Sequence, residues 1–281
     1  MINVISSGLY TSFQDLGRFG YRKFGVPVSG AMDRYSAKLA NQLVGNNEGE
    51  TVMEITLTGP VLRFDIDIEI AITGAGFSPT LNNIEIPLNT RIFVPANGIL
   101  KFGLASYGLR AYLAIAGGYI LPEYLGSKSF YQGITPARIV RKGESFVANK
   151  PNTKGRRASA SVKEDISFFV SSRIQVSKGP EFQKLNLLQK EILFETAFQI
   201  GSESNRMAYI LGHSETISLP EIITASVQPG TVQLTPSGKL IVLMRDAQTT
   251  GGYSRVLQLS ERAIDRLSQK RTGEMIRFEI I

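Results

Sequence analysis

Cysteine and tryptophan are absent from the sequence, and His213 is its only histidine. Without cysteine the chain can form neither a disulfide nor a thiolate metal site, and it offers no thiol nucleophile. One isolated histidine does not supply the paired imidazoles typical of a zinc site, so we expect no bound metal. Imidazole, carboxylate and hydroxyl groups remain for any chemistry.

Long hydrophobic runs are also missing. No apolar segment approaches the ~20 residues that a membrane-spanning helix needs, and the first residues lack the charged start and apolar segment of a signal peptide. We therefore expect a cytoplasmic protein with no membrane partner. The 281 residues, 43% of them hydrophobic, can form one large domain or two of ordinary size.

The positive charge lacks the pattern of a nucleic-acid-binding protein. The formal net charge is +7, but the basic residues are scattered and do not alternate with aromatic residues that could stack on bases. The densest basic group, Lys154, Arg156 and Arg157, lies in a polar stretch that resembles a linker. We expect no nucleic-acid partner, and an acidic protein partner or an anionic small substrate accounts for the excess charge.

Several named motifs are incomplete. The sequence Leu-Gly-Ser-Lys-Ser at residues 125–129 resembles the end of a phosphate-binding P-loop, but the required glycines are missing. The segment Gly74-Ala75-Gly76 lacks the third glycine of a dinucleotide fingerprint, and Pro79 would interrupt the helix that should follow it. No G-x-S-x-G elbow of a serine hydrolase is present.

Hydrophobic alternation and turn residues indicate a mainly β chain with a few helices. One helix is expected at residues 34–44, with Asp33 as its N-terminal cap and Gly45 as its end, and a last helix is expected after Ser260. A further helix is predicted at residues 185–197. Strands are predicted at residues 3–6, 51–57, 61–64, 66–72, 91–94, 100–104, 110–116, 137–140, 173–177, 221–225, 230–234, 240–244 and 276–280.

The domain organisation follows from one polar stretch. Residues 148–165 contain no large apolar side chain except Val162, so they form a loop or a boundary between subdomains. We predict a β-rich subdomain at residues 1–150, a polar linker or loop at 151–165, and a second β-rich subdomain at 166–281. These boundaries are approximate.

Two loops carry the candidate functional residues. After an apolar strand, the segment 245–253 brings together Asp246, Gln248, Gly251, Gly252 and Tyr253. Paired glycines allow close approach to a ligand and can direct N–H groups at an anion or a carbonyl oxygen. The glycine-rich and aromatic segment 13–33 is predicted to be an ordered loop that lines one cleft with the first. A polar hairpin turn at 245–253 is the alternative.

A family resemblance rests on several motifs along nearly the whole chain. They are FQDLGRFGYRKFGVPVSGAMD at residues 13–33, Glu54-Ile55, Gly59-Pro60, RAYLAIAGG, LGSKS and LMRDAQTTGGY. The chain resembles the biotin-dependent carboxyltransferase-like family. This family includes the C subunit of 5-oxoprolinase, the kinase-inhibitor antagonist protein, the second component of allophanate hydrolase, and the carboxyltransferase domain of urea carboxylase, an amidolyase component.

The resemblance implies a fold, an activity and partners. It implies two cyclophilin-like β-barrel subdomains with a cleft between them. It also implies ATP-dependent opening of 5-oxoproline to L-glutamate by a complex with two further 5-oxoprolinase components. One partner would be a kinase-inhibitor-like protein of the B type, and the other would be a protein of the A type. ATP, with Mg²⁺ as a possible companion, would then be a cosubstrate of the assembled complex.

The same resemblance suggests roles for individual residues. Asp246 would accept a hydrogen bond from the substrate amide or hold Mg²⁺, while Tyr253 and Asn41 orient the ring, and Asp33 joins this catalytic set. Arg18 and Arg206, with Gln248 and the Gly251-Gly252 N–H groups, would bind substrate or phosphate. If Asp246 is a site residue with a free carboxylate, Asp246→Asn should fold with near-normal stability but lose turnover.

Two other functions stay open. One is a carboxyltransferase component that acts on urea or a related amide, with biotin carried by another chain, because no Met-Lys-Met attachment site is present. The other is a non-catalytic regulatory protein that binds a kinase-inhibitor partner. The chain also departs from the family pattern at Asn205, Ala208 and Ile210, where a carboxylate, a glycine and an arginine are usual.

Overall fold

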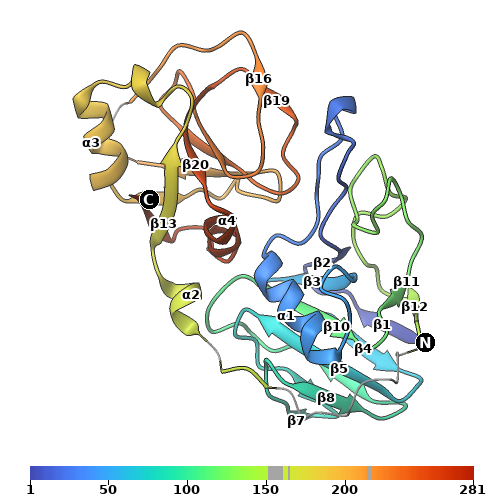
Figure 1. Ribbon diagram of the computed structural model, residues 1–281. Helices are drawn as coiled ribbons and strands as arrows, with labels where there is room; N and C mark the ends of the chain where they lie inside the picture. The colour runs from blue at the N-terminus through green and yellow to red at the C-terminus, as the bar shows by residue number, and fades with distance from the viewer. Residues whose placement is uncertain (151–160, 164, 214–216) are drawn as a thin grey trace. The chain divides into compact units, whose positions relative to one another are not determined.

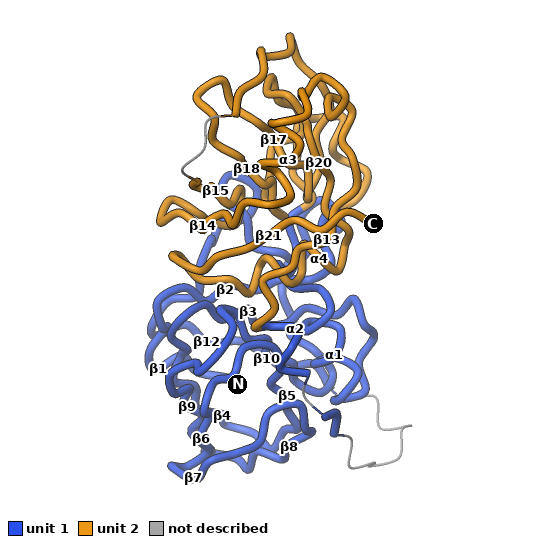
Figure 2. The backbone as a smooth tube through the Cα atoms, turned by 90° about the vertical axis from the view of Figure 1, so that its left-hand side faces the viewer, with its two compact units in different colours: residues 1–18, 29–169 blue, residues 19–28, 170–281 orange. Residues whose placement is uncertain are grey.

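A computed structural model describes residues 1–150, 161–163, 165–213 and 217–281 (Figure 1). These residues form a mainly β fold with a few short helices, which confirms the predicted fold class. The chain divides into two compact units, coloured in Figure 2. Unit 1 contains residues 1–18 and 29–169, and unit 2 contains residues 19–28 and 170–281. Most of the predicted linker, residues 151–160 and 164, lies outside the described residues.

Unit 1 is built from two antiparallel sheets. The five-stranded sheet has the order β2 (Tyr10–Gln14), β3 (Val52–Thr56), β10 (Arg110–Ile115), β5 (Ile68–Gly74) and β8 (Arg91–Val94). The seven-stranded sheet has the order β11 (Tyr119–Ile120), β12 (Ser145–Ala148), β1 (Ile2–Ser6), β4 (Val61–Phe64), β9 (Ile99–Lys101), β6 (Thr80–Leu81) and β7 (Ile84–Glu85). Strands from both sheets contribute buried apolar side chains to one core.

Helix α1 (Arg34–Val44) packs against β5 and β10 of the five-stranded sheet. Its sequence predicts both ends correctly. The Asp33 carboxylate accepts a hydrogen bond of 3.0 Å from the Ser36 N–H, and Gly45 ends the helix with φ of 78°, where a side chain would be strained. The apolar side of the helix, including Ala37, Ala40 and Leu43, is buried against the sheet.

Unit 2 contains a closed barrel. Its strands follow the order β13 (Arg173–Lys178), β20 (Ser254–Leu259), β17 (Thr231–Leu234), β18 (Leu240–Leu243), β15 (Ala208–Gly212), β14 (Phe198–Ile200) and β21 (Met275–Ile280). The first and last of these strands close the ring by parallel pairing, in which Ile174 lies opposite Phe278. A short ribbon of β16 (Ala225–Ser226) and β19 (Thr250–Gly251) accompanies the barrel.

The remaining helices are short. Helix α2 (Ile166–Val170) spans the point in the chain where the first unit ends, while α3 (Leu187–Glu195) and α4 (Glu261–Ser268) belong to unit 2. Ser260 caps α4 as predicted, because its hydroxyl accepts a hydrogen bond from the Ala263 N–H. The described segments 22–24 and 182–184 form single 3₁₀ turns, η1 (Arg22–Phe24) and η2 (Phe182–Lys184).

Some predicted elements are wrong. Residues 137–140 form no strand, although Val140 is buried and its N–H donates to the Thr11 carbonyl. Of the strand predicted at 221–225, only the short β16 at its end exists. The boundary between the two compact units falls at residues 169–170, and the segment 19–28 groups with unit 2. Strands β2, β6, β7, β11, β12, β14, β15, β19 and β20 were not predicted.

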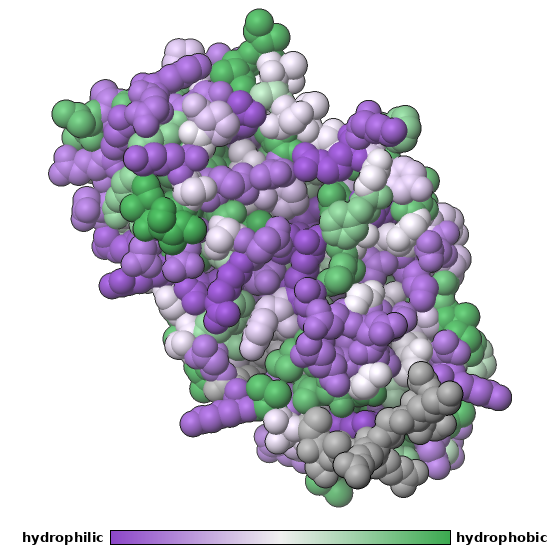
Figure 3. Space-filling view, viewed as in Figure 1, coloured by the Kyte–Doolittle hydropathy of each residue, from purple (hydrophilic) through white to green (hydrophobic). Residues whose placement is uncertain are grey.

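No helix in the described part of the chain is long and apolar enough to cross a membrane. The face seen in Figure 3 is predominantly hydrophilic, and its hydrophobic side chains form separate groups. Neither observation tests the predicted cytoplasmic location, which stays a prediction.

A buried guanidinium links the barrel to its helix. The Arg245 side chain is 1% exposed and donates to Asp265 at 2.8 Å and to Glu261 at 2.9 Å, both on α4. Asp265 is itself buried, whereas the Glu261 side chain is 70% exposed. Removing a buried charge leaves its partner without compensation, which costs far more than losing an exposed pair.

We therefore expect Arg245→Met to lower the free energy of unfolding by about 3–5 kcal/mol, because the buried Asp265 carboxylate loses this cation. Arg173→Met is the matched control, since Arg173 pairs with Glu279 at 3.2 Å on the surface of the same unit. That control should cost less than about 1 kcal/mol. Urea unfolding followed by circular dichroism measures both values, and equal losses would contradict the expectation.

Candidate active site

The polar loop after β18 is held by backbone pairing to the segment before β15. The two strands pair antiparallel, with Ala208 opposite Leu243. Beyond them, the Met244 N–H donates to the Met207 carbonyl at 2.9 Å, and the Asp246 N–H donates to the Arg206 carbonyl at 3.0 Å. The backbone at Asp246 is therefore placed by an extension of the barrel pairing.

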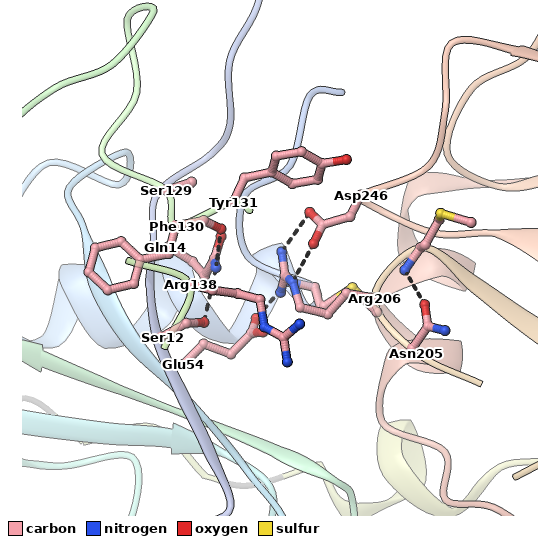
Figure 4. Close-up of polar contacts among 12 residues, drawn as sticks. Ser12, Gln14, Glu54, Ser129, Phe130, Tyr131, Arg138, Asn205, Arg206 and Asp246 are labelled. Atoms are coloured by element: carbon pink, nitrogen blue, oxygen red, sulfur yellow. Dashed lines mark hydrogen bonds and ion pairs between the residues drawn. The ribbon is translucent and has the colours of Figure 1, made fainter. Parts of the chain in front are cut away.

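Asp246 and Arg206 form a bidentate ion pair, drawn in Figure 4. Nε of Arg206 donates to Oδ2 at 2.8 Å, and Nη2 donates to Oδ1 at 3.1 Å. The two side chains are 9% and 13% exposed. This geometry orients the carboxylate, and each of its oxygens keeps acceptor capacity for a further N–H donor. Two predicted site residues are thus joined, and the predicted free carboxylate is paired.

The rest of the loop is tied to residues 220–227. The Val227 N–H donates to the Thr249 carbonyl at 3.0 Å, and the Ile222 N–H donates to the Gly252 carbonyl at 2.8 Å. Gly251 belongs to β19, where it lies opposite Ala225. Gln248, Gly251, Gly252 and Tyr253 therefore share one ordered loop with Asp246, as the sequence indicates, and their roles in ligand binding stay predictions.

A buried amide lies against this loop and was not predicted. Gln233 is 1% exposed, and its Nε2 atom has no hydrogen-bond partner among the described residues. A Cβ on Gly251 would come within 2.6 Å of that atom, so the amide end of Gln233 packs closely against this glycine and would have to shift for a larger residue. The Oε1 atom of Gln248 is likewise buried without a partner in the described structure. Buried amide atoms without partners are uncommon, and they mark candidate ligand contacts.

Three predicted residues lie in unit 1 and have structural partners there. Arg18 is fully buried, and its guanidinium donates to the carbonyls of Tyr124 and Ser129. The Asn41 amide donates to the Glu50 carbonyl at 2.7 Å, which ties the end of α1 to the following turn. Asp33 caps α1. These contacts explain the three residues as parts of the fold, and nothing in them tests a role in catalysis.

A buried polar network adjoins Asp33. The Tyr112 hydroxyl donates to Oε2 of Glu54 at 3.0 Å and accepts from the Asp33 N–H at 2.7 Å. The same Glu54 oxygen accepts from the Met32 N–H at 2.7 Å, and Arg110 lies 3.9 Å away from the other oxygen. Burial, followed by the charges of Glu54 and Asp33, raises the pKa of Tyr112 well above its ordinary value. The phenol therefore stays protonated as a hydrogen-bond donor.

Unit 2 also contains an open groove of about 940 Å³. Segment 22–25 of the predicted N-terminal loop and Thr249 and Thr250 of the second loop both line it. The predicted cleft between the two subdomains stays a prediction. Its lining residues are Arg22, Lys23, Gly25, Ser177, Lys178, Gly179, Pro180, Ser226, Val227, Gln228, Thr231, Thr249, Thr250, Arg255, Leu257 and Gln258. The four cations have no aspartate or glutamate among the residues that line the groove with them.

The model of the carboxyltransferase domain, subdomains A and B, matches residues 24–280. The chain belongs to this family. The C subunit of 5-oxoprolinase from Escherichia coli (strain K12) is 33% identical over 284 residues, which cover 99% of this chain and 90% of that protein. The urea amidolyase of Saccharomyces cerevisiae (strain ATCC 204508 / S288c) is 30% identical across 99% of this chain, but the match covers 16% of that protein.

Solved structures agree with this membership. The structure of TTHA0988 is similar with a TM-score of 0.89 and 30% identity, covering 99% of this chain and 55% of that one. The carboxyltransferase-family chain thus spans about half the length of TTHA0988. The Kluyveromyces lactis urea amidolyase gives a TM-score of 0.88 and 30% identity, over 99% of this chain and 18% of that one.

The departures from the carboxyltransferase family pattern fit their surroundings. The Asn205 amide oxygen accepts from the Met207 N–H at 2.8 Å, so it forms the turn before β15 without a carboxylate (Figure 4). Ala208 lies in β15, where extended backbone needs no glycine. Ile210 packs its side chain against the apolar cluster that contains Ala208 and Leu243.

Clusters of carboxylate and histidine side chains are the candidate metal sites of this chain. Within the described ranges of this carboxyltransferase-family chain, no group of three or more histidine, aspartate or glutamate side chains could hold a metal ion. Asp246 is the predicted Mg²⁺ ligand, and its carboxylate is paired with Arg206. The role of Asp246 as an Mg²⁺ ligand stays a prediction.

Substitution of Asp33 separates a capping role from a catalytic one. Both carboxylate oxygens bond to Ser36, at 3.0 Å to the N–H and 2.6 Å to the hydroxyl. Asp33→Ala should lower the free energy of unfolding by about 1–2 kcal/mol, whereas Asp33→Asn keeps an oxygen for the helix N–H and should lose much less.

Urea unfolding of the two variants measures this difference, and turnover of the enzyme assembled with its partners completes the test. If Asp33 acts only as a cap, Asp33→Asn keeps near-normal turnover. A stable Asp33→Asn variant with strongly reduced turnover would instead place the Asp33 charge in the chemistry.

Proposed function

We propose that this chain is a component of an ATP-dependent 5-oxoprolinase, which opens 5-oxoproline to L-glutamate together with partner proteins. The observation that carries the proposal is the match to a 5-oxoprolinase component across 99% of this chain and 90% of the relative. The urea amidolyase match covers a small part of a much longer protein. The partners would be a kinase-inhibitor-like protein of the B type and a protein of the A type.

The Arg206–Asp246 pair suits recognition of a cyclic amide. A lactam presents one N–H donor and one carbonyl acceptor, and a carboxylate oxygen of Asp246 can accept the N–H. Arg206 contributes by holding the carboxylate in one orientation, since two of its N–H groups bind both oxygens. The partnerless amide atoms of Gln233 and Gln248 add a donor and an acceptor on and beside the same loop.

The proposed chemistry activates an unstrained amide. Transfer of the terminal phosphoryl group of ATP to the amide oxygen releases ADP and makes the ring carbon electrophilic. Attack by one water and cleavage of the C–N bond, with a proton passing to the leaving nitrogen, give an acyl phosphate, and a second water hydrolyses it to glutamate and phosphate. The phosphoryl transfer requires cations or N–H donors around the transferred group. Any Mg²⁺ would arrive with the nucleotide, whose phosphate oxygens are ligands that this ion prefers.

The carboxyltransferase alternative is supported by the family model and by the amidolyase relatives. Asp246 would then accept an N–H of urea or a related amide, and biotin would be delivered on another polypeptide. Glutamate formation that requires ATP and 5-oxoproline supports the first proposal, whereas urea-dependent decarboxylation of carboxybiotin supports the second. A complex that only changes the activity of a kinase inhibitor would indicate the regulatory alternative.

We expect the isolated chain neither to hydrolyse ATP appreciably nor to open 5-oxoproline. The physical reason is that the Arg206–Asp246 pair can hold an amide but supplies no phosphoryl donor, and the sequence contains no complete nucleotide motif. Glutamate release is measured with the chain alone and after adding the two partner proteins. Robust turnover by the single chain would overturn the dependence on partners, and inactivity of the full assembly would overturn the proposed function.

For Asp246→Asn we expect turnover of the assembled enzyme to fall by at least about a hundredfold, because the amide lacks the charge that accepts the substrate N–H. The ion pair adds a cost that the sequence did not suggest: Arg206 loses a charged partner, so stability should fall by about 1–3 kcal/mol. Turnover is therefore measured per folded protein, with the folded fraction taken from circular dichroism.

The matched control is Glu279→Gln, which makes the same change in the exposed pair with Arg173. It should leave both turnover and stability nearly unchanged. Near-wild-type turnover of Asp246→Asn at an equal folded fraction would move the chemistry to another loop or another protein of the complex.

A further inference from the structure

We propose that the basic groove of unit 2 binds a polyphosphate chain, such as that of a nucleoside triphosphate. The choice of ATP as the ligand rests on the proposed ATP-dependent function. The preference for an anion with several phosphate groups rests on the residues that line the groove. The groove is distinct in sequence from Asp246, since its lining comes from residues 22–25, 177–180, 226–231, 249–250 and 255–258.

The residues that line the groove give it a net positive charge. Arg22, Lys23, Lys178 and Arg255 line the groove, and none of the residues that line it with them is acidic. The nearest carboxylate partner, Glu181, binds Arg255 through both oxygens, each at 2.9 Å. Hydrogen bonding from Arg255 lowers the pKa of Glu181, so this carboxylate stays ionised as a fixed partner. Three lining cations, for which the described structure shows no such carboxylate partner, then remain to attract an anion.

Hydroxyl side chains also line the groove, and two backbone segments approach each other closely in its wall. Ser177, Ser226, Thr249 and Thr250 accompany the cations around the same space, whereas the hydroxyl of Thr231 is buried and donates to Gln258 at 2.9 Å. Phosphate oxygens accept hydrogen bonds from hydroxyls as well as from cationic side chains, so this mixed set matches a phosphate chain. Gly179 is required at its place, because a Cβ there would lie 2.3 Å from the Arg255 carbonyl.

Hydrogen bonds hold the segments that form the walls of the groove. The Arg22 guanidinium donates to the Val227 carbonyl, which ties segment 22–25 to the strand ribbon, and Arg255 donates to the Ser226 carbonyl at 3.1 Å. Lys23 and Lys178 contact the rings of Phe24 and Phe182, at 5.0 and 5.4 Å, and their ammonium groups can turn from these rings to a ligand. Such rearrangement gives up only a weak interaction.

The size of the groove favours a small ligand over an acidic protein partner. Its volume of about 940 Å³ lies within the range of ligand sites, which is roughly 300–1,000 Å³. A stable protein interface would instead cover about 800 Å² on each partner, much of it outside a groove. Pro180 is exposed and provides apolar surface for the remainder of a nucleotide, while Leu257 and Val227 are buried beneath the lining.

Binding of ATP and of inorganic triphosphate to the full chain tests this proposal, using isothermal titration calorimetry at low and at moderate salt. We expect both compounds to bind, and binding to weaken as salt increases. The variant Lys23→Gln/Lys178→Gln should weaken both by at least about tenfold. The control Lys142→Gln/Lys239→Gln makes the same change in net charge at exposed positions outside the groove and should bind normally.

Three results of the binding experiments would overturn the groove assignment: no binding of either phosphate compound, unchanged binding by the groove variant, or preferential binding of an acidic peptide such as decaglutamate. Turnover of the assembled enzyme distinguishes failure of the groove assignment from failure of the proposed function. Normal ATP-dependent turnover by the groove variant would overturn the groove assignment alone. If the chain binds triphosphate but its complex with the partners does not open 5-oxoproline, the proposed function is overturned and the phosphate site stands.

Discussion

The parallel pairing of β13 with β21 is the contact on which unit 2 depends, because it joins the first and last strands of the ring. Residues 173–176 lie opposite residues 277–280, about a hundred residues later in the chain. Without this pairing both strands would present an unpaired edge, and the closed barrel would become an open sheet. Arg206 and Asp246 extend from β15 and β18, two neighbours in the same ring, so barrel closure also supports the geometry of their ion pair.

The structure shows which sequence signals are reliable. Helices α1 and α4 were predicted well, because Asp33 and Ser260 cap them through bonds to residues three positions away. A strand instead needs a partner that a local pattern does not reveal. Val140 illustrates this limit: the pattern around it predicted a strand, but its N–H donates to the Thr11 carbonyl while residues 137–140 form no strand. Short strands such as β14 and β15 exist because of their neighbours in the barrel and escaped prediction for the same reason.

The sequence indicated which residues belong to the candidate site but not which of them contact each other. Asp246 follows an apolar strand and Arg206 lies within a segment that resembles the family pattern, yet forty positions separate them. Only the antiparallel register of β15 and β18 shows that they pair. Gln233 had a usable signal, a lone amide between Val232 and Leu234 in a strand that is buried throughout. The basic groove had none, because five separate chain segments build it.

The ion pair by itself does not distinguish the activities found in this family. Both 5-oxoproline and urea present an amide N–H, and a carboxylate held by one arginine can accept either. Selectivity must therefore come from the groups that activate the carbonyl. A phosphoryl donor requires cations and hydroxyls near the transferred group, whereas carboxybiotin brings an activated carboxyl group on another polypeptide. The cations of the groove matter for this reason: a phosphate-binding role would favour ATP-dependent lactam opening, because transfer of a carboxyl group from biotin has no step that needs a polyphosphate site on this chain.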